Sequence, residues 1–153
     1  ALRVLIGILF FYAGWTKLIN PEWTAAGFLT TAKTFPALYE WFANSVNITW
    51  VNFLNQWGLT AVGLAMISGL LVRPAAIGGI IIMTLYYFPG LEFPFVDHGF
   101  LVDDHIVYIA VFAVLYVENA GKHYGLDHFI SCGKAKKSKS KTKKPAKGSK
   151  SGR

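Results

Sequence analysis

Four stretches of apolar residues follow one another along the first 118 positions, separated by short segments that contain proline, glycine or charged residues. Apolar runs of about 20 residues are typical of helices that cross the hydrocarbon core of a bilayer. The pattern therefore predicts an all-α integral membrane protein built as a four-helix bundle. We place the membrane spans at residues 2–19, 49–72, 75–88 and 104–118, within one domain that covers residues 1–130.

Proline marks the boundaries of these runs. Asn20-Pro21 is predicted to stop the first helix, and Pro89-Gly90 to open the loop before the fourth. Arg73-Pro74 is predicted to form a tight turn, which would make the second and third spans an antiparallel hairpin. Glycines inside the spans are predicted to lie where helix backbones pack closely in lipid, namely Gly7, Gly14, Gly63, Gly69, Gly78 and Gly79.

The segment from Glu22 to Val46 has a different pattern, in which aromatic side chains are mixed with polar ones and interrupted by Gly27 and Pro36. Such a mixture is typical of the boundary between lipid and water. We expect one or two short helices here, lying at the membrane interface in the first outer loop.

Charged residues divide the chain into two unequal parts. Residues 1–121 hold four basic and seven acidic residues, whereas residues 122–153 hold eleven basic residues and one acid, Asp127. Residues 131–153 are predicted to form a disordered, Lys-rich tail, because they have too few apolar side chains to fold. Anionic membrane lipid is the expected partner of this tail. Nucleic acid is not, because no aromatic residues alternate with the lysines.

The basic residues also predict an orientation. Four spans place both ends of the chain on one side of the membrane, and that side holds Arg3, Arg73 and the tail. Basic residues favour the cytoplasmic side. We therefore expect a multi-pass protein of the cell membrane with both termini in the cytoplasm.

Ionisable groups at the ends of the fourth span are the first candidates for chemistry. From Ile106 to Val117 only twelve uncharged residues follow one another, roughly 18 Å of helix at 1.5 Å per residue. A hydrocarbon core is about 30 Å thick. Either residues 103–105 or residues 118–119 dip below an interface, or the bilayer thins. An ionisable side chain among membrane helices is by default a functional candidate.

The second span supplies further polar groups. Asn52, Asn55 and Gln56 are spaced i, i+3 and i+4, so they share one helical face. We expect them at the depth of the acidic start of the fourth span, where Trp15 and Lys17 end the first helix. The prediction is a polar pocket in the outer half of the bundle, roofed by the aromatic loop segments.

Each group also has a second interpretation. Asp103 and Asp104 are typical helix caps, and the amides of the second span could hold helices together at about 0.6 kcal/mol per contact. His98 and His105, with nearby acids, could bind a metal, but their spacing fits no standard motif and no metal is predicted. The single cysteine, Cys132, excludes a Cys-rich metal site. A proton relay to a bound redox lipid fits better, because histidine titrates near neutrality and carboxylates can pass protons on.

Four motifs then occur in order: Arg3-x3-Gly7-x6-Gly14-x2-Lys17; Gly63 to Gly69 followed by Arg73; His98-Gly99-Phe100 to Asp104-His105-Ile106-Val107-Tyr108; and Gly121-Lys122-His123-Tyr124-Gly125-Leu126-Asp127. Together they resemble the DoxX/DoxD family over nearly the whole chain, to about Ile130. The resemblance implies a four-helix membrane fold.

The DoxD branch of this family is the membrane subunit of thiosulfate:quinone oxidoreductase, which works with a smaller DoxA subunit, oxidises thiosulfate to tetrathionate and passes electrons to quinone. The resemblance thus implies a quinone-linked redox subunit with Asp104 and His105 handling protons. The residues expected around the quinone are Trp15, Lys17, Asn52, Gln56, His98 and Tyr108. The chain departs from the family in its Lys-rich tail and in having no acid between Glu40 and Glu92, where Gln56 lies instead of the expected early Glu.

A second class of function stays open. A chain of 16.9 kDa leaves little room for a complete electron-transfer apparatus. It could equally be a non-catalytic scaffold or accessory subunit of a larger membrane complex. A transporter is a more distant alternative, because the four spans show no inverted repeat.

Overall fold

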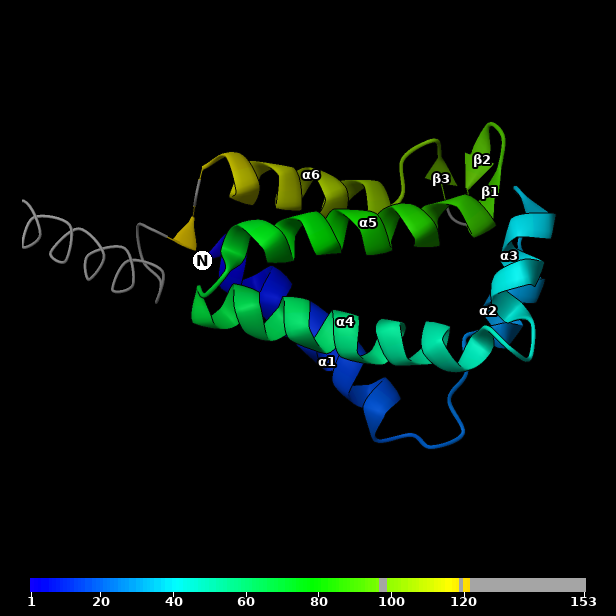
Figure 1. Cartoon of the computed structure of the whole chain (residues 1–153). Helices are drawn as coiled ribbons and strands as arrows, with labels where there is room; N and C mark the ends of the chain where they lie inside the picture. Colours follow the sequence, from blue (N-terminus) through cyan, green and yellow to red (C-terminus); the bar gives the residue numbers. More distant parts are fainter. Residues whose placement is uncertain (97–98, 119, 122–153) are drawn as a thin grey trace, which may run out of the picture.

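The structure is a computed structural model that describes residues 1–96, 99–118 and 120–121. Within these residues the chain is mostly helical, as the sequence predicted (Figure 1). The helices are α1 (Leu2–Leu18), α2 (Ala26–Thr30), α3 (Pro36–Ala43), α4 (Ile48–Ser68), α5 (Val72–Gly90) and α6 (Asp104–Val117). The tail at residues 131–153, together with Asp97, His98 and Cys132, lies outside the described residues.

A small antiparallel sheet joins α5 to α6 and was not expected from the sequence. Its strands are β1 (Leu91–Glu92), β2 (Phe95–Val96) and β3 (Gly99–Phe100), in the order β1-β2-β3. Leu91 pairs with Val96, and Phe95 pairs with Phe100. Strands of two residues are too short to produce the alternation of apolar and polar positions by which a strand is recognised.

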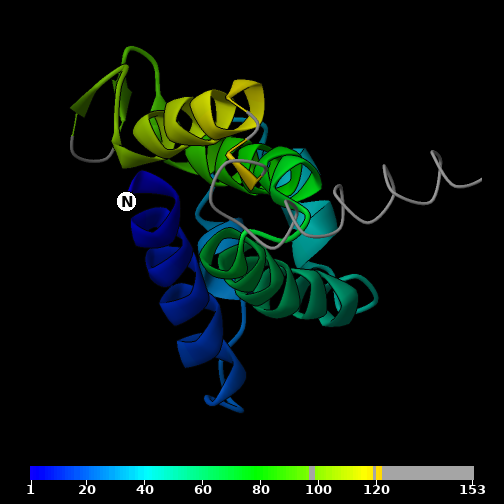
Figure 2. The same cartoon turned by 90° about the vertical axis from the view of Figure 1, so that its left-hand side faces the viewer.

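One cluster of buried side chains connects the four long helices. It contains Ile6, Phe10, Leu59, Val62, Met66, Val72, Ala76, Met83, Phe112 and Leu115. The ring of Phe10 on α1 packs edge-on against Phe112 and Tyr108 of α6, with ring centres 4.9 and 6.0 Å apart. Beyond this contact α1 runs obliquely, and its carboxyl end lies on the far side of α4 from α6 (Figures 1 and 2).

Glycine allows α1 and α4 to approach closely. A Cβ atom at Gly7 would lie 2.9 Å from the Cβ of Met66 and from the backbone nitrogen of Ile67. Gly14 faces Thr60 in the same way, and Gly63 faces the backbone of Phe11. Any side chain at these positions would push the two helices apart.

The remaining predicted packing glycines have different surroundings. A Cβ at Gly79 would lie 2.6 Å from ring atoms of Phe112, so this glycine brings α5 and α6 together. Gly78 has only an ordinary contact, 3.5 Å from Val62 Cγ2. Gly69 ends α4 with φ of 72°, a left-handed conformation that glycine adopts at little cost.

The turn between α4 and α5 lies earlier than the expected Arg73-Pro74. α4 ends at Ser68, and α5 already begins at Val72. Pro74 therefore falls in the first turn of α5, where the N–H that proline lacks would have no partner in the helix. Pro89 also lies inside α5, which ends at Gly90, whereas we expected Pro89-Gly90 to open the loop.

α2 and α3 cover the end of the molecule opposite the N-terminus (Figure 1). They pack together around Ala25, Leu29 and Tyr39. The hydroxyl of Tyr39 donates to the carbonyl oxygen of Leu85 on α5 at 3.0 Å, and burial raises the pKa of this hydroxyl. Pro36 begins α3, whereas Gly27 lies inside α2. Their expected location at a membrane interface stays a prediction.

Among the described residues, α5 alone is both long and apolar enough to cross a membrane. α6 is a shorter apolar helix of 14 residues. α1, α4, α5 and α6 overlap the ranges that we assigned to membrane spans, and the number of spans stays a prediction. Large apolar side chains are nevertheless exposed along all four helices, for example Tyr12, Phe53, Ile81 and Val114. Such a surface is typical of a protein that contacts lipid or a partner.

Candidate functional site

A cavity of about 550 Å³ lies among the helices, at the end that α2 and α3 cover. Its volume falls in the range of small-molecule sites, about 300–1,000 Å³. α4 and α5 supply most of its walls, and α1 and α6 contribute Lys17 and His105. The other lining residues are Trp23, Thr24, Ala25, Phe28, Leu29, Tyr39, Phe42, Trp50, Val51, Leu54, Asn55, Gly58, Gly78, Ile81, Ile82, Leu85 and Tyr86.

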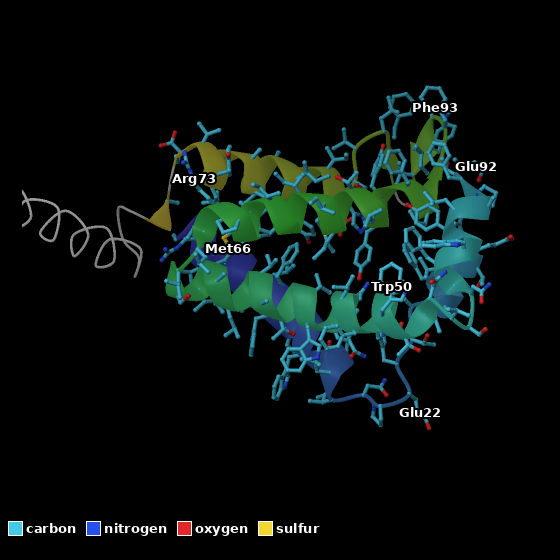
Figure 3. All side chains as sticks on the ribbon, in the orientation of Figure 1. Glu22, Trp50, Met66, Arg73, Glu92 and Phe93 are labelled. Atoms are coloured by element: carbon cyan, nitrogen blue, oxygen red, sulfur yellow. The ribbon has the colours of Figure 1, made fainter. Side chains whose placement is uncertain are left out.

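Aliphatic and aromatic side chains form most of the wall, whereas we expected a polar pocket. Trp50 of α4 lies close to α3 (Figure 3), where its ring packs edge-on against Phe42 and Trp41 with centres 5.9 and 6.4 Å apart. Of the three amide side chains that share a face of α4, only Asn55 lines the cavity. A cavity of this kind favours a ligand with a flat apolar body and few polar atoms.

His105 is the titratable side chain that α6 brings to the cavity. Its Nδ1 atom lies 2.6 Å from Oδ2 of Asp103, and the other carboxylate oxygen of Asp103 accepts a hydrogen bond from the backbone N–H of Ile106 at 3.2 Å. Asp103 is therefore at once the N-cap of α6 and the partner of His105. A carboxylate on Nδ1 fixes the orientation of the ring, and no described residue hydrogen-bonds to Nε2.

Asp104, the predicted catalytic carboxylate, is a more distant neighbour of this histidine. Its Oδ1 atom lies 3.4 Å from Nδ1 of His105, and its side chain is 65% exposed, against 11% for Asp103. Asp104 is also not among the lining residues. The geometry thus assigns the orienting role to Asp103, for which the sequence had left open a functional role and a role as a helix cap.

Asp103, Asp104 and His105 also offer ligand atoms that lie within 4.8 Å of one another, as a metal site would. Both oxygens of Asp103 already have partners, one of them the histidine itself. These contacts account for the cluster as a helix cap and its paired histidine, and we assign no metal to it.

Lys17 reaches the cavity from the last turn of α1. Its Nζ atom donates to the carbonyl oxygen of Ala13 at 3.2 Å and lies 5.4 Å from the centre of the Trp23 ring. No carboxylate of the described residues forms an ion pair with it. Lys17 therefore places a basic side chain at the cavity wall, and its expected role in ligand binding stays a prediction.

Asn52 and Gln56, two predicted binding residues, instead attach other parts of the chain to α4: Asn52 holds the segment after α1, and Gln56 holds the last turn of α1. Oδ1 of Asn52 accepts from the backbone N–H of Ala25 at 2.9 Å, and Nδ2 donates to Oγ1 of Thr24 at 3.2 Å. Nε2 of Gln56 donates to the carbonyl oxygen of Lys17 at 3.4 Å. Neither amide lines the cavity, and both hold neighbouring parts of the chain in place beside it.

Two further predicted residues also lie away from the cavity. Trp15 is half exposed and stacks on Phe11, with ring centres 6.0 Å apart. Tyr108 packs against Phe10 in the core. His98 lies outside the described residues.

Tyr86 was missed from the sequence and lies at the centre of the wall. Its hydroxyl donates to Oδ1 of Asn55 at 2.5 Å. The ring packs edge-on against His105 and Phe28, with centres 6.0 and 5.6 Å apart. One tyrosine within an apolar run gives no pattern that separates it from ordinary core residues, so only the fold could identify it.

Two side-chain contacts join the segment between α2 and α3 to β1. Nζ of Lys33, after α2, lies 2.9 Å from Oε2 of Glu92, and this contact holds the pKa of the Glu92 carboxyl below its usual value. The hydroxyl of Thr34 donates to the carbonyl oxygen of Leu91 beside it. The segment between α2 and α3 is thereby joined to the sheet.

Residues 1–89 match the model of the DoxX family. This range contains every lining residue of the cavity except His105. Comparison with the curated proteins and with the solved structures found no match.

Proposed function

Because the chain belongs to the DoxX family, we propose that it is a quinone-linked redox subunit of the membrane, which binds quinone in the cavity beside His105. The observation that carries this proposal is the pairing of His105 with Asp103 at the wall of an otherwise apolar cavity. A quinone has a flat apolar ring and two carbonyl oxygens that become hydroxyls on reduction. Its chemistry therefore needs an apolar space and a proton donor.

Several features of the cavity support a quinone as the ligand. The space of about 550 Å³ is large enough for a substituted ring and the first part of a lipid tail. Aromatic side chains such as Phe28, Phe42 and Trp50 can pack against the ring. Lys17 and His105 offer polar hydrogens to carbonyl oxygens, and each comes from a different helix.

The proposed reaction takes its electron donor from the resemblance to DoxD. Two thiosulfate ions join through a new S–S bond to give tetrathionate and release two electrons. The quinone takes up these electrons and two protons and becomes a quinol. Thiosulfate or a related sulfur compound delivers the electrons, directly or through a small partner subunit.

His105 would supply a proton at the quinone oxygen. When its ring is protonated, Nδ1–H stays bonded to Asp103 and Nε2–H can be given to the ligand. The carboxylate of Asp103 stabilises the positive ring before the transfer and keeps Nε2 available. Asp104 is exposed and lies 3.4 Å from the same ring, so it can return protons from the surroundings.

For the membrane we propose a four-helix bundle with four spans and both termini in the cytoplasm. Arg73 lies at the end of the molecule where the chain begins, whereas Glu22 and Glu92 lie at the opposite end (Figure 3). Basic residues favour the cytoplasmic side. In this orientation the cavity belongs to the outer half of the bundle, and α2 and α3 lie at the outer interface.

The test is a combined measurement on protein purified in mild detergent. Lipid extraction and mass spectrometry measure bound quinone, and thiosulfate-dependent quinone reduction is assayed on the same sample with its native partners. We expect stoichiometric quinone, and reduction that His105→Ala abolishes while the helical circular dichroism spectrum is unchanged. A sample that retains its partners but shows neither quinone nor reduction would refute the proposal.

We also propose a second candidate function, a non-catalytic scaffold or accessory subunit, on the basis of one exposed surface. Phe93, in the turn between β1 and β2, is 80% exposed, and Phe95 and Phe100 of the small sheet are 62% and 63% exposed. Aromatic side chains are enriched in protein interfaces. A scaffold would co-purify with other membrane subunits through this patch and carry no quinone, so the measurement above separates the two functions.

A further inference from the structure

The cavity wall contains a second pair of polar side chains, which has no role in the proposed reaction. Asn55 on α4 and Tyr86 on α5 both line the cavity, and the hydroxyl of Tyr86 donates to Oδ1 of Asn55 at 2.5 Å. The bond joins two helices across the wall. A hydrogen bond between two side chains in largely apolar surroundings holds both groups in defined positions.

Packing restricts Tyr86 further. Its ring lies between Phe28 of α2 and His105 of α6, and both contacts are edge-to-face. Rings in such contacts have a preferred geometry and do not turn freely. The hydroxyl of Tyr86 is therefore held at one place on the wall.

The fixed hydroxyl decides which way the amide of Asn55 faces. An asparagine side chain has one oxygen that accepts and one nitrogen that donates two hydrogens. Because the oxygen is bound to Tyr86, the nitrogen Nδ2 is the atom left for another partner. No described residue accepts a hydrogen bond from Nδ2, and the side chain is half buried at the cavity. Its N–H groups thus form a donor that a ligand in the cavity can use.

We propose that Asn55 binds a carbonyl oxygen of the ligand through Nδ2, and that Tyr86 is the positioning residue that turns this amide toward the cavity. This inference rests on the proposed function and specifies the ligand class. The ligand is a six-membered ring with acceptor oxygens at opposite positions, one bound by His105 and the other by Asn55.

Tyr86 lies against both groups that would bind the ligand. It contacts His105 with its ring and Asn55 with its hydroxyl, so one phenol side chain connects the two polar groups. A para-quinone ring carries its oxygens across a six-membered ring of the same kind. A ring with a single oxygen would leave either Asn55 or His105 without a partner, which costs binding free energy.

The experiment uses the full chain in phosphatidylcholine nanodiscs and a decyl-para-benzoquinone that carries ¹³C at one or the other carbonyl. Infrared difference spectra give the stretching frequency of each carbonyl, which falls when the oxygen accepts a hydrogen bond. Quenching of tryptophan fluorescence gives the Kd of the same ligand. We expect two shifted carbonyl bands in the wild-type protein.

Variants then separate the two roles. Asn55→Leu should return one carbonyl band to its unbound frequency, leave the other band unchanged, and raise the Kd roughly tenfold, the effect of one hydrogen bond. Tyr86→Phe should broaden the same band and raise the Kd by a smaller factor. The double variant should bind no worse than Asn55→Leu alone, because Tyr86 acts through the amide.

Tyr87→Phe is the matched control. Tyr87 is the next residue along α5, and its hydroxyl donates to the carbonyl oxygen of Leu101 at 2.7 Å, away from the cavity lining. This variant loses a tyrosine hydrogen bond of similar geometry and should leave both bands and the Kd unchanged.

Two results would overturn the inference in different ways. If the wild-type protein binds the quinone but Asn55→Leu leaves both bands and the Kd unchanged, this site assignment is wrong and the proposed function stands. If the wild-type protein binds no quinone, both fail. Additive losses in the double variant would show that Tyr86 does not act through Asn55.

Discussion

Asp103 holds His105 by a carboxylate oxygen 2.6 Å from Nδ1, while its other oxygen caps the helix on which His105 lies. One side chain therefore determines both where α6 begins and which nitrogen of the histidine remains available. This double role allows the two effects to be separated by mutation.

Asp103→Asn should reduce quinone turnover with little change in stability. Asparagine caps helices about as well as aspartate does, so α6 should keep its start. It lacks the negative charge that stabilises a protonated His105, and we expect turnover to fall roughly tenfold or more. Steady-state quinone reduction and thermal unfolding in detergent measure the two effects.

Asp104→Asn is the control for this prediction. The Asp104 side chain is mostly exposed and caps nothing, and its proposed role is to return protons to His105, so turnover should fall less than in Asp103→Asn. Equal losses in the two variants would contradict the assignment of the orienting role to Asp103.

Gly63→Ala should destabilise the protein by separating α1 from α4. The added methyl group would meet the backbone of Phe11, which cannot move without shifting the whole helix. Overpacking of this kind costs roughly 1–3 kcal/mol. Unfolding in denaturant in the same detergent gives the change in free energy.

Gly27→Ala provides the comparison, because no atom lies within 4 Å of a Cβ built at Gly27. Alanine in this short helix should be neutral or should stabilise by about 0.5–1 kcal/mol. If Gly63→Ala is as harmless as Gly27→Ala, the close contact between α1 and α4 is wrong.

The ion pair between Lys33 and Glu92 should make the attachment of the cavity cover depend on pH. Lys33 lowers the pKa of Glu92 in the folded protein, so its contribution to stability is present above the unfolded value of about 4.3. That contribution is lost as the pH falls through the lower, folded pKa. Hydrogen exchange of residues 31–35, followed from pH 6 to pH 3, should show faster opening at the acidic end.

Glu92→Gln should remove this pH dependence, and salt should weaken it in the wild-type protein. Both side chains are largely exposed, and added salt weakens the attraction between exposed charges. A pH response that persists unchanged in Glu92→Gln would have to come from other groups.

The helices could be predicted because long apolar runs determine them, but their ends depended on single residues. Pro74 suggested a turn, yet proline is equally suited to the first turn of α5, and Gly69 was free to end α4 earlier. Both arrangements satisfy the local rules, so packing decides between them. The small sheet was missed because each of its strands has two residues, too few to show an alternation of apolar and polar positions.

Several residues of the candidate site were predicted from the sequence, but the contacts between their side chains were not. Asp103 and Asp104 are adjacent in the sequence, and only the backbone conformation at the start of α6 shows which of them faces His105. The amides of α4 share a face, yet Asn52 bonds to the segment after α1 and Gln56 bonds to the last turn of α1. These competing partners are distant in the sequence and give no local signal.

The division of the cavity between two parts of the chain has a consequence for how the family can diversify. Residues 1–89 supply the whole lining except His105, which arrives on a separate helix after the sheet. Substitution of His105 would leave the rest of the lining intact but remove the proposed proton donor. Gain or loss of this one histidine would therefore change the proposed chemistry of the cavity without a change of fold.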